Sequence, residues 1–260
     1  MWTKGGSAVH YAAIGDSFTE GVGDERPDGT CRGWADRVAE GLAAVLDEPV
    51  HYANLAVRGR LLEPIVTDQL DLALAMDPLP TLITLNGGGN DMMRPGVDAD
   101  RLVRLTEHAV RRCADAGVRL VVLSGADPSR RLPFGRTVHR RGVALTRAVK
   151  ALARRNDLLM VDAFNDVEVT RAAYWSPDRL HLNPAGHARV ASLVLSALGH
   201  PTTPDPVEHP VVARRLATEA RYYREHVVPW LGRRLRGRSS GDDHPAKHTG
   251  WTSVEAQPAV

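Results

Sequence analysis

Short apolar runs alternate along the chain with longer amphipathic segments, and this alternation constrains the fold more than any other feature. The short runs are rich in Val, Ile and Leu and are bounded by Gly, Asn or Asp, as is typical of buried strands. They occupy residues 9–14, 50–55, 81–85, 119–123 and 158–161. Helical patterns occupy residues 33–46, 61–76, 100–116, 137–155 and 185–198. Alternation of this kind builds right-handed βαβ units, so we expect an α/β protein with a five-stranded parallel sheet and helices on both faces.

Length and charge exclude several classes of protein. A chain of 260 residues can bury a full core without a metal or disulfide staple. Its 33 basic and 31 acidic residues leave a net charge of +2, which is too balanced for a protein that coats nucleic acid, so no nucleic-acid partner is expected. The two cysteines fit a reducing compartment. No apolar signal segment and no membrane-spanning run is visible, so we expect a cytoplasmic protein.

The composition changes near residue 200 and predicts three regions. Residues 1–200 form the main domain, and residues 201–238 form a Pro-rich strap followed by a basic amphipathic helix. We expect the apolar stripe of this helix to pack against the main domain, with contact to an acidic membrane surface or a protein partner as the alternative. Residues 239–260 are polar and aperiodic, which predicts a disordered tail.

Residues that can do chemistry follow the predicted strands at the edge where doubly wound sheets bind ligands. Ser17 follows the first strand, Gly59 follows the second, and Asn90 follows three glycines after the third. Turn N–H groups and the Asn carboxamide can both donate to an oxyanion. A Gly-rich turn also suggests phosphate binding, but the Lys-Ser/Thr and Gly-x-Gly-x-x-Gly signatures of such loops are missing.

An Asp-x-x-His pair, Asp178 and His181, follows the fifth predicted strand. One turn of backbone brings these side chains together, so that the carboxylate accepts from one ring nitrogen and leaves the other as a base. A lone serine or histidine usually has a structural role, and it is their joint occurrence at strand ends that indicates a site. No metal-ligand spacing occurs, and His244 and His248 fall in the predicted tail, where we expect them to be exposed to solvent.

On these residues the sequence resembles the SGNH hydrolases, also called GDSL-type esterases and lipases. The family's four blocks occur in order as Gly15-Asp16-Ser17-Phe18, Gly59, Gly88-Gly89-Asn90-Asp91 and Asp178-Arg179-Leu180-His181, within residues 8–198. Phe18 stands where the family has Leu. The resemblance implies a flavodoxin-like three-layer α/β/α sandwich. It also implies Ser17 as nucleophile, His181 as general base and Asp178 as the group that orients it, with an oxyanion hole made by the N–H groups of Ser17 and Gly59 and the Asn90 side chain.

We therefore expect a serine esterase that acts on a small carboxylic ester, with a short acyl or O-acetyl group, and needs no cofactor. The low aromatic content of 5% disfavours triglyceride-sized substrates. An acyltransferase that uses the same acyl-enzyme and a non-catalytic binding module remain alternatives. Of the remaining candidates, Asp16 and Asp91 are interpreted as supporting or turn-forming carboxylates, His187 as a packed helix residue and Cys31 as an inert small residue. The oligomeric state is not predicted.

Overall fold

A six-stranded sheet forms the centre of the protein, whose computed structural model describes residues 8–132, 135–203, 241 and 245–256. The strand order is β5-β4-β3-β1-β2-β6. The strands are β1 Val9–Ile14, β2 Val50–Asn54, β3 Leu82–Asn86, β4 Arg119–Leu123, β5 Leu159–Val161 and β6 His248–Val254. β1 to β5 pair in parallel, which confirms the five predicted strands to within a residue at each end.

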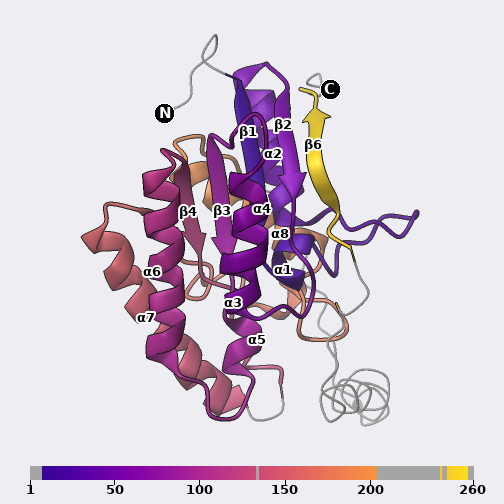
Figure 1. The fold of residues 1–260 in the computed structure, drawn as a ribbon. Helices are drawn as coiled ribbons and strands as arrows, with labels where there is room; N and C mark the ends of the chain where they lie inside the picture. Colours follow the sequence, from indigo (N-terminus) through magenta and orange to yellow (C-terminus); the bar gives the residue numbers. More distant parts are fainter. Residues whose placement is uncertain (1–7, 133–134, 204–240, 242–244, 257–260) are drawn as a thin grey trace.

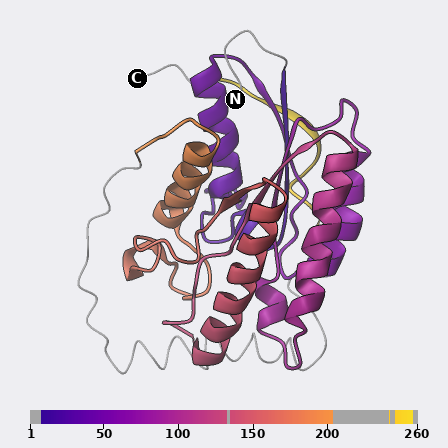
Figure 2. The same ribbon diagram turned by 90° about the vertical axis from the view of Figure 1, so that its left-hand side faces the viewer.

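Helices cover both faces of this sheet and make the predicted three-layer sandwich (Figure 1). They are α1 Ser17–Glu20, α2 Gly33–Leu46, α3 Leu62–Pro64, the π-helical η1 Ile65–Gln69, α4 Leu70–Leu74, α5 Gly89–Met92, α6 Ala99–Asp115, α7 Gly135–Arg155, the 3-10 helix η2 Ala172–Tyr174 and α8 Pro184–Ala197. In Figure 2 the sheet lies between α2 and α8 on one side and α6 on the other. Two apolar clusters fill these two interfaces, because alternate residues of each buried strand point to opposite faces.

The helix predicted over residues 61–76 is divided into three short pieces. α3 contains Pro64, the π-helical η1 follows, and α4 completes the segment. A π-helical turn inside a helix is often found at a functional site. Here it ends at Gln69, whose buried side chain turns inward to the end of β1.

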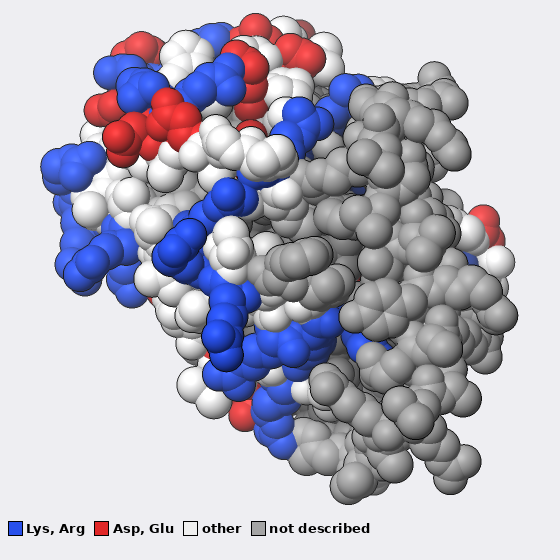
Figure 3. All heavy atoms as spheres, turned by 90° about the horizontal axis from the view of Figure 1, so that it is seen from below, with Lys and Arg blue, Asp and Glu red and all other residues white. Residues whose placement is uncertain are grey.

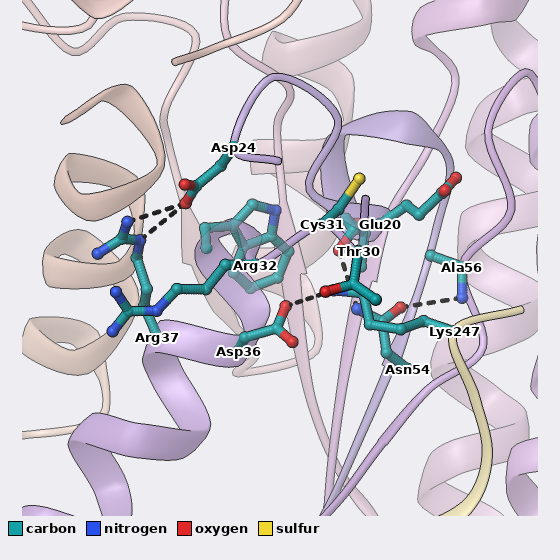
Figure 4. Close-up of polar contacts among 12 residues, drawn as sticks. Glu20, Asp24, Thr30, Cys31, Arg32, Asp36, Arg37, Asn54, Ala56 and Lys247 are labelled. Carbon is teal, nitrogen blue, oxygen red and sulfur yellow. Dashed lines mark hydrogen bonds and ion pairs between the residues drawn. The ribbon is translucent and has the colours of Figure 1, made fainter. Parts of the chain in front are cut away.

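The prediction of a disordered tail over residues 239–260 is wrong for the residues of β6, which pairs antiparallel with β2 and extends the sheet. Pairing covers the edge of β2 that would otherwise present free N–H and C=O groups. Figure 4 shows how Lys247 reaches Asp36 on α2, where Nζ and Oδ2 lie 2.7 Å apart. His248, expected to be exposed to solvent, is instead half-buried and makes a T-shaped contact with the Tyr52 ring, with the ring centroids 6.0 Å apart. These contacts attach the C-terminal strand to the main domain.

The predicted strap and basic helix of residues 201–238 lie, from residue 204 onward, outside the described residues. Within the part of the chain that the structure describes, no helix is both long enough and apolar enough to cross a membrane.

Candidate active site

The candidate residues gather where the strand order of the sheet reverses. β1 lies between β2 and β3, and in open α/β sheets the crevice outside the carboxyl ends of such strands is the usual binding site. Ser17 begins α1 directly after β1, and Asn90 lies in α5 after β3. Figure 3 views the molecule from below, toward the carboxyl ends of the parallel strands, and shows a band of Lys and Arg side chains on this face.

The turn that carries Ser17 is held by polar contacts on both sides. Asp16 caps α1, because its Oδ1 accepts the Phe18 N–H at 3.1 Å. Gln69 accepts the Gly15 N–H at 2.7 Å and donates to the Gly15 carbonyl at 3.0 Å. A Cβ at Gly15 would lie 2.3 Å from Thr19 Oγ1, so only glycine fits this turn. The start of α1 is therefore fixed relative to the sheet.

Ser17, His181 and Asp178 form one continuous hydrogen-bonded chain. His181 Nε2 lies 3.1 Å from Ser17 Oγ, and His181 Nδ1 lies 2.5 Å from Asp178 Oδ2. The His181 and Asp178 side chains are 20% and 27% exposed, which leaves them within reach of a ligand. The structure thus joins the Asp178–His181 pair to a serine that lies 164 positions before the histidine in the sequence.

Local backbone geometry explains why a spacing of three residues joins the aspartate to the histidine. Asp178 Oδ1 accepts the N–H groups of Leu180 and His181, each at 3.0 Å, and this closes an Asx-type turn. The Ser176 N–H donates to the His181 carbonyl at 2.9 Å, so a hydrogen bond also joins the two ends of the loop that contains Asp178. Arg179 takes a φ of +61° at the bend. Short-range bonds therefore set the geometry of the pair.

The electrostatics of the pair define which ring nitrogen carries a proton. Burial by itself would raise the pKa of Asp178, but the hydrogen bond and charge of His181, with two backbone N–H groups, outweigh it and lower the pKa. Asp178 is therefore ionised at neutral pH and accepts a hydrogen bond from His181 Nδ1. In a neutral imidazole that donates from Nδ1, Nε2 carries no proton and accepts the Ser17 hydroxyl hydrogen, which is the arrangement of a general base.

Asn90 connects the Ser17 turn to the loop after β2. Its Nδ2 donates to Asp16 Oδ2 at 3.1 Å and to the Arg60 carbonyl at 3.0 Å. Gly59 has a φ of +76° and stands third in a turn that the Arg60 N–H closes on the Val57 carbonyl at 3.4 Å. Asn90 is thus hydrogen-bonded to the residues that adjoin Ser17 and Gly59, the other two residues predicted to form an oxyanion hole.

The supporting residues predicted from the sequence have distinct surroundings. Burial raises the pKa of Asp16 to about 6, although the Phe18 N–H and His181 lower it in part. Asp91 Oδ2 accepts the Leu62 N–H at 2.9 Å and so holds the start of α3. Burial raises the pKa of the Cys31 thiol, which keeps it protonated.

His187 is fully buried in α8 and joins two other elements. Its Nδ1 accepts the backbone N–H of Trp34 at 3.2 Å, so Nε2 carries the proton and donates to the Val22 carbonyl at 3.2 Å. Burial lowers the pKa of His187 to about 4. His187 therefore ties the helix after the His181 loop to the loop after α1.

Sequence reasoning missed the polar residues that support the site, which are the buried Glu20, Asn54 and Gln69 and the half-buried Arg58. Asn54 donates to the Thr19 carbonyl at 3.1 Å and accepts the Ala56 N–H at 3.1 Å, which links α1 to the end of β2. Asn54 ends a mostly apolar run, whereas Glu20, Arg58 and Gln69 stand next to other polar residues or glycine and carry no such signal. Among the described side chains, no group of three or more His, Cys, Asp or Glu could hold a metal ion.

Comparison with known proteins gives one family and a common fold. The model of the GDSL-like Lipase/Acylhydrolase family matches residues 13–189, whereas no curated protein matches the sequence. The lipase Lip_vut3 from a goat rumen metagenome is 19% identical, with a TM-score of 0.61 over 75% of this chain and 99% of that chain. The acetylxylan esterase Axe2 from Geobacillus stearothermophilus is 24% identical, with a TM-score of 0.57 over 76% of this chain and 97% of that chain.

A third solved structure, the psychrotrophic esterase EstA from Pseudoalteromonas sp. inhibited by monoethylphosphonate, is 15% identical, with a TM-score of 0.58 over 73% of this chain and 96% of that chain. At these identities the three structures share the fold of this protein. The family match spans more than half of the chain and includes the turn of Ser17 and the loop of His181. The chain belongs to the GDSL-like lipase/acylhydrolase family of carboxylic ester hydrolases.

Proposed function

We propose that the protein is a serine esterase that hydrolyses a small carboxylic ester through an acyl-enzyme on Ser17. The observation that carries this proposal is the hydrogen-bonded chain from Asp178 through His181 to Ser17, with distances of 2.5 Å and 3.1 Å. A serine hydroxyl is a weak nucleophile until a neighbouring base removes its proton, and this chain supplies that base.

Acylation begins when Ser17 Oγ attacks the ester carbonyl carbon and His181 Nε2 takes the hydroxyl proton. The Asp178 carboxylate stabilises the imidazolium that forms and holds the ring in place. Collapse of the tetrahedral intermediate breaks the bond to the alcohol oxygen, which receives the proton from His181 Nε2. The alcohol leaves and the acyl group remains on Ser17.

The negative charge on the tetrahedral oxygen needs donors that are in place before the reaction. The N–H groups of Ser17 and Gly59 and the Asn90 amide are our candidates. Both Asn90 amide hydrogens already have acceptors, Asp16 Oδ2 and the Arg60 carbonyl. An oxyanion is a stronger hydrogen-bond acceptor than the neutral carbonyl of the ester. An Asn90 hydrogen shared between its present acceptor and the oxyanion therefore stabilises the transition state more than the bound ester.

Deacylation repeats the same steps with water. His181 Nε2 takes a proton from a water molecule as the water oxygen attacks the acyl carbon, and then returns it to Ser17 Oγ as the acid leaves. Each cycle consumes one ester and one water and produces one alcohol and one acid.

We propose a short acyl group, acetyl in particular, as the substrate class. An acetylxylan esterase is among the proteins of the same fold, and the aromatic content of 5% offers little lining for a long acyl chain. The exposed fractions of His181 and Asp178, 20% and 27%, suit a substrate that reaches the triad from solvent.

A fluorophosphonate probe tests the nucleophile directly, with mass spectrometry to locate the adduct. We expect labelling at Ser17 and none in Ser17→Ala. Labelling at another residue, or no labelling of a folded wild-type protein, would remove the proposed function.

Hydrolysis of p-nitrophenyl acetate tests the other roles. We expect His181→Ala to lower kcat strongly and Asp178→Asn to lower it less completely, because binding and the oxyanion donors survive. Asn90→Ala should lower kcat by about 10²-fold to 10³-fold with little change in KM. An increase in KM at constant kcat would assign Asn90 to substrate binding instead. If added alcohols capture the acyl group in preference to water, the protein is a transferase.

A further inference from the structure

Glu20 is a buried carboxylate in the same short helix as the candidate nucleophile. It lies one helical turn after Ser17 in α1 and is 4% exposed. In Figure 4 its carboxylate extends away from the Asp36–Lys247 pair, so the two buried acids have separate partners. Charges at this depth are costly unless they are paired and hydrogen-bonded, which makes the partner of Glu20 informative.

Arg58 is that partner, and it binds Glu20 through both its backbone and its side chain. Glu20 Oε2 accepts the Arg58 backbone N–H at 2.8 Å. Arg58 Nε lies 2.9 Å and 3.1 Å from the two carboxylate oxygens, and Nη2 also contacts Oε1. A planar guanidinium that meets a carboxylate in this way gives directional bonds as well as charge. Glu20 therefore holds Arg58 both at its backbone N–H and at its guanidinium group.

Arg58 is the second residue of the turn that presents Gly59. The Arg60 N–H closes this turn on the Val57 carbonyl at 3.4 Å. Gly59, the third residue, has a φ of +76°, whereas Arg58 is not among the residues with positive φ. This combination defines a type II turn. Types I and II differ by a reversal of the central peptide, here Arg58–Gly59, so the turn type decides which way the Gly59 N–H points.

We propose that Glu20 is a positioning residue that, through Arg58, holds the turn of residues 57–60 in its type II form and so aims the Gly59 N–H at the oxyanion. α1 carries Ser17 at its first residue and Glu20 at its last, so one rigid element fixes the nucleophile and the second donor relative to each other. The inference rests on the proposed function, because it assigns Gly59 a role in the oxyanion hole. It leaves the proton path from Ser17 through His181 to Asp178 unchanged.

Two variants remove the link in different ways, and a third is a matched control. Glu20→Gln removes the charge of the acceptor, and Arg58→Lys keeps the positive charge but loses the planar fork. Glu40→Gln breaks another Glu–Arg pair, with Arg32, on α2. The measurements are kcat and KM for p-nitrophenyl acetate, the pH dependence of kcat, the rate of fluorophosphonate labelling at Ser17, and urea unfolding.

We expect kcat to fall about tenfold or more in Glu20→Gln and Arg58→Lys, since one well-aimed donor is worth about 10²-fold to 10³-fold in kcat. KM should stay within about twofold, and the pH dependence of kcat should keep its wild-type midpoint, because His181 is untouched. Labelling at Ser17 should slow in parallel, while Glu40→Gln retains wild-type values. A merely structural role of Glu20 would lower the urea midpoint without moving kcat per folded molecule.

Wild-type kcat in either folded variant, or a rise in KM alone, would overturn the inference. If Glu20→Gln does not fold, Arg58→Lys gives the deciding result, because Glu20 then keeps a cationic partner. Failure of the proposed function is distinguishable, since it appears as absent Ser17 labelling in the wild-type protein before any variant is compared.

Discussion

Replacing Asp16 with asparagine should stabilise the protein above neutral pH and weaken its catalysis. Burial raises the pKa of Asp16 from its ordinary value of 3.8 to about 6. The difference corresponds to a cost of about 3 kcal/mol for the ionised carboxylate in the folded state. The folded protein carries this whole cost above pH 6 and almost none of it below pH 3.8, so the contribution of Asp16 to stability falls as pH rises between these values.

The Asp16→Asn variant would keep the shape of the side chain without its charge. The new amide oxygen can still accept the Phe18 N–H, but the new NH₂ group would face the Asn90 amide donor that Asp16 Oδ2 accepts in the wild type. Loss of that hydrogen bond leaves the Asn90 donor unsatisfied, which costs about 1 to 3 kcal/mol. We therefore expect Asp16→Asn to be about 1 kcal/mol more stable than wild type near pH 8 and about 1 to 2 kcal/mol less stable near pH 4.

Urea unfolding followed by tryptophan fluorescence at both pH values measures this difference. The control is Asp36→Asn, since burial also raises the pKa of Asp36 to about 6, with Lys247 lowering it in part. Both variants should show a change of stability with pH of the same sign, but only Asp16→Asn should lose kcat, by about tenfold, because Asn90 is no longer held. A stability difference that is equal at the two pH values would refute the titration of Asp16, and an unchanged kcat would refute its hold on Asn90.

Three further outcomes are expected from other parts of the structure. Burial lowers the pKa of His187 from 6.5 to about 4, so its contribution to stability is lost as pH falls through this range. The wild-type protein should therefore lose unfolding free energy between about pH 7.5 and pH 4.5, and in His187→Gln this loss, measured by urea unfolding, should be about 2.5 kcal/mol smaller. A Cβ at Gly241 would lie 2.0 Å from the Arg58 carbonyl; Gly241→Ala should cost about 1 to 3 kcal/mol in unfolding free energy, whereas Gly250→Ala, with no atom within 4 Å of its Cβ, should cost under about 0.5 kcal/mol. The band of Lys and Arg in Figure 3 should attract anionic esters, so kcat/KM for a carboxylate-bearing ester should fall between about 0.01 M and 0.15 M salt while that for p-nitrophenyl acetate stays constant.

The parallel sheet and the triad loop could be predicted because local sequence determines them. The five parallel strands are short and mostly apolar segments, as is typical of strands covered on both faces, although polar residues such as His10, Thr84 and Arg119 interrupt them. The Asp178–His181 pair depends on a turn closed by its own backbone, so its spacing in the sequence is sufficient to predict it. The meeting of His181 with Ser17 then follows from the shared edge of the sheet.

β6 could not be predicted, because its sequence lacks the signals of a strand. Its residues are largely exposed or half-buried, and the strand includes Gly250 and several hydroxyl side chains. The contacts that hold it are distant in sequence, such as Lys247 with Asp36 and Trp251 Nε1 with the Pro78 carbonyl at 3.1 Å. An edge strand of this kind is defined by its partner rather than by its own composition.

The partly exposed residues of the site could be predicted from the sequence and the buried residues that support them could not, and this difference has a physical cause. The side chains that we propose to meet the substrate, those of Ser17, Asn90 and His181, must be reachable; they are partly exposed and their motifs are readable in the sequence. The groups that aim them are excluded from water, because a hydrogen bond is stronger and more directional where water cannot compete. Gln69 and Glu20, which hold the Ser17 turn and the Arg58–Gly59 peptide, are 6% and 4% exposed, and each stands beside a polar residue or glycine in the sequence, which does not mark it as buried. If precise donor geometry limits the rate, substitutions at these buried positions should lower kcat more than they raise KM, although neither residue touches the substrate.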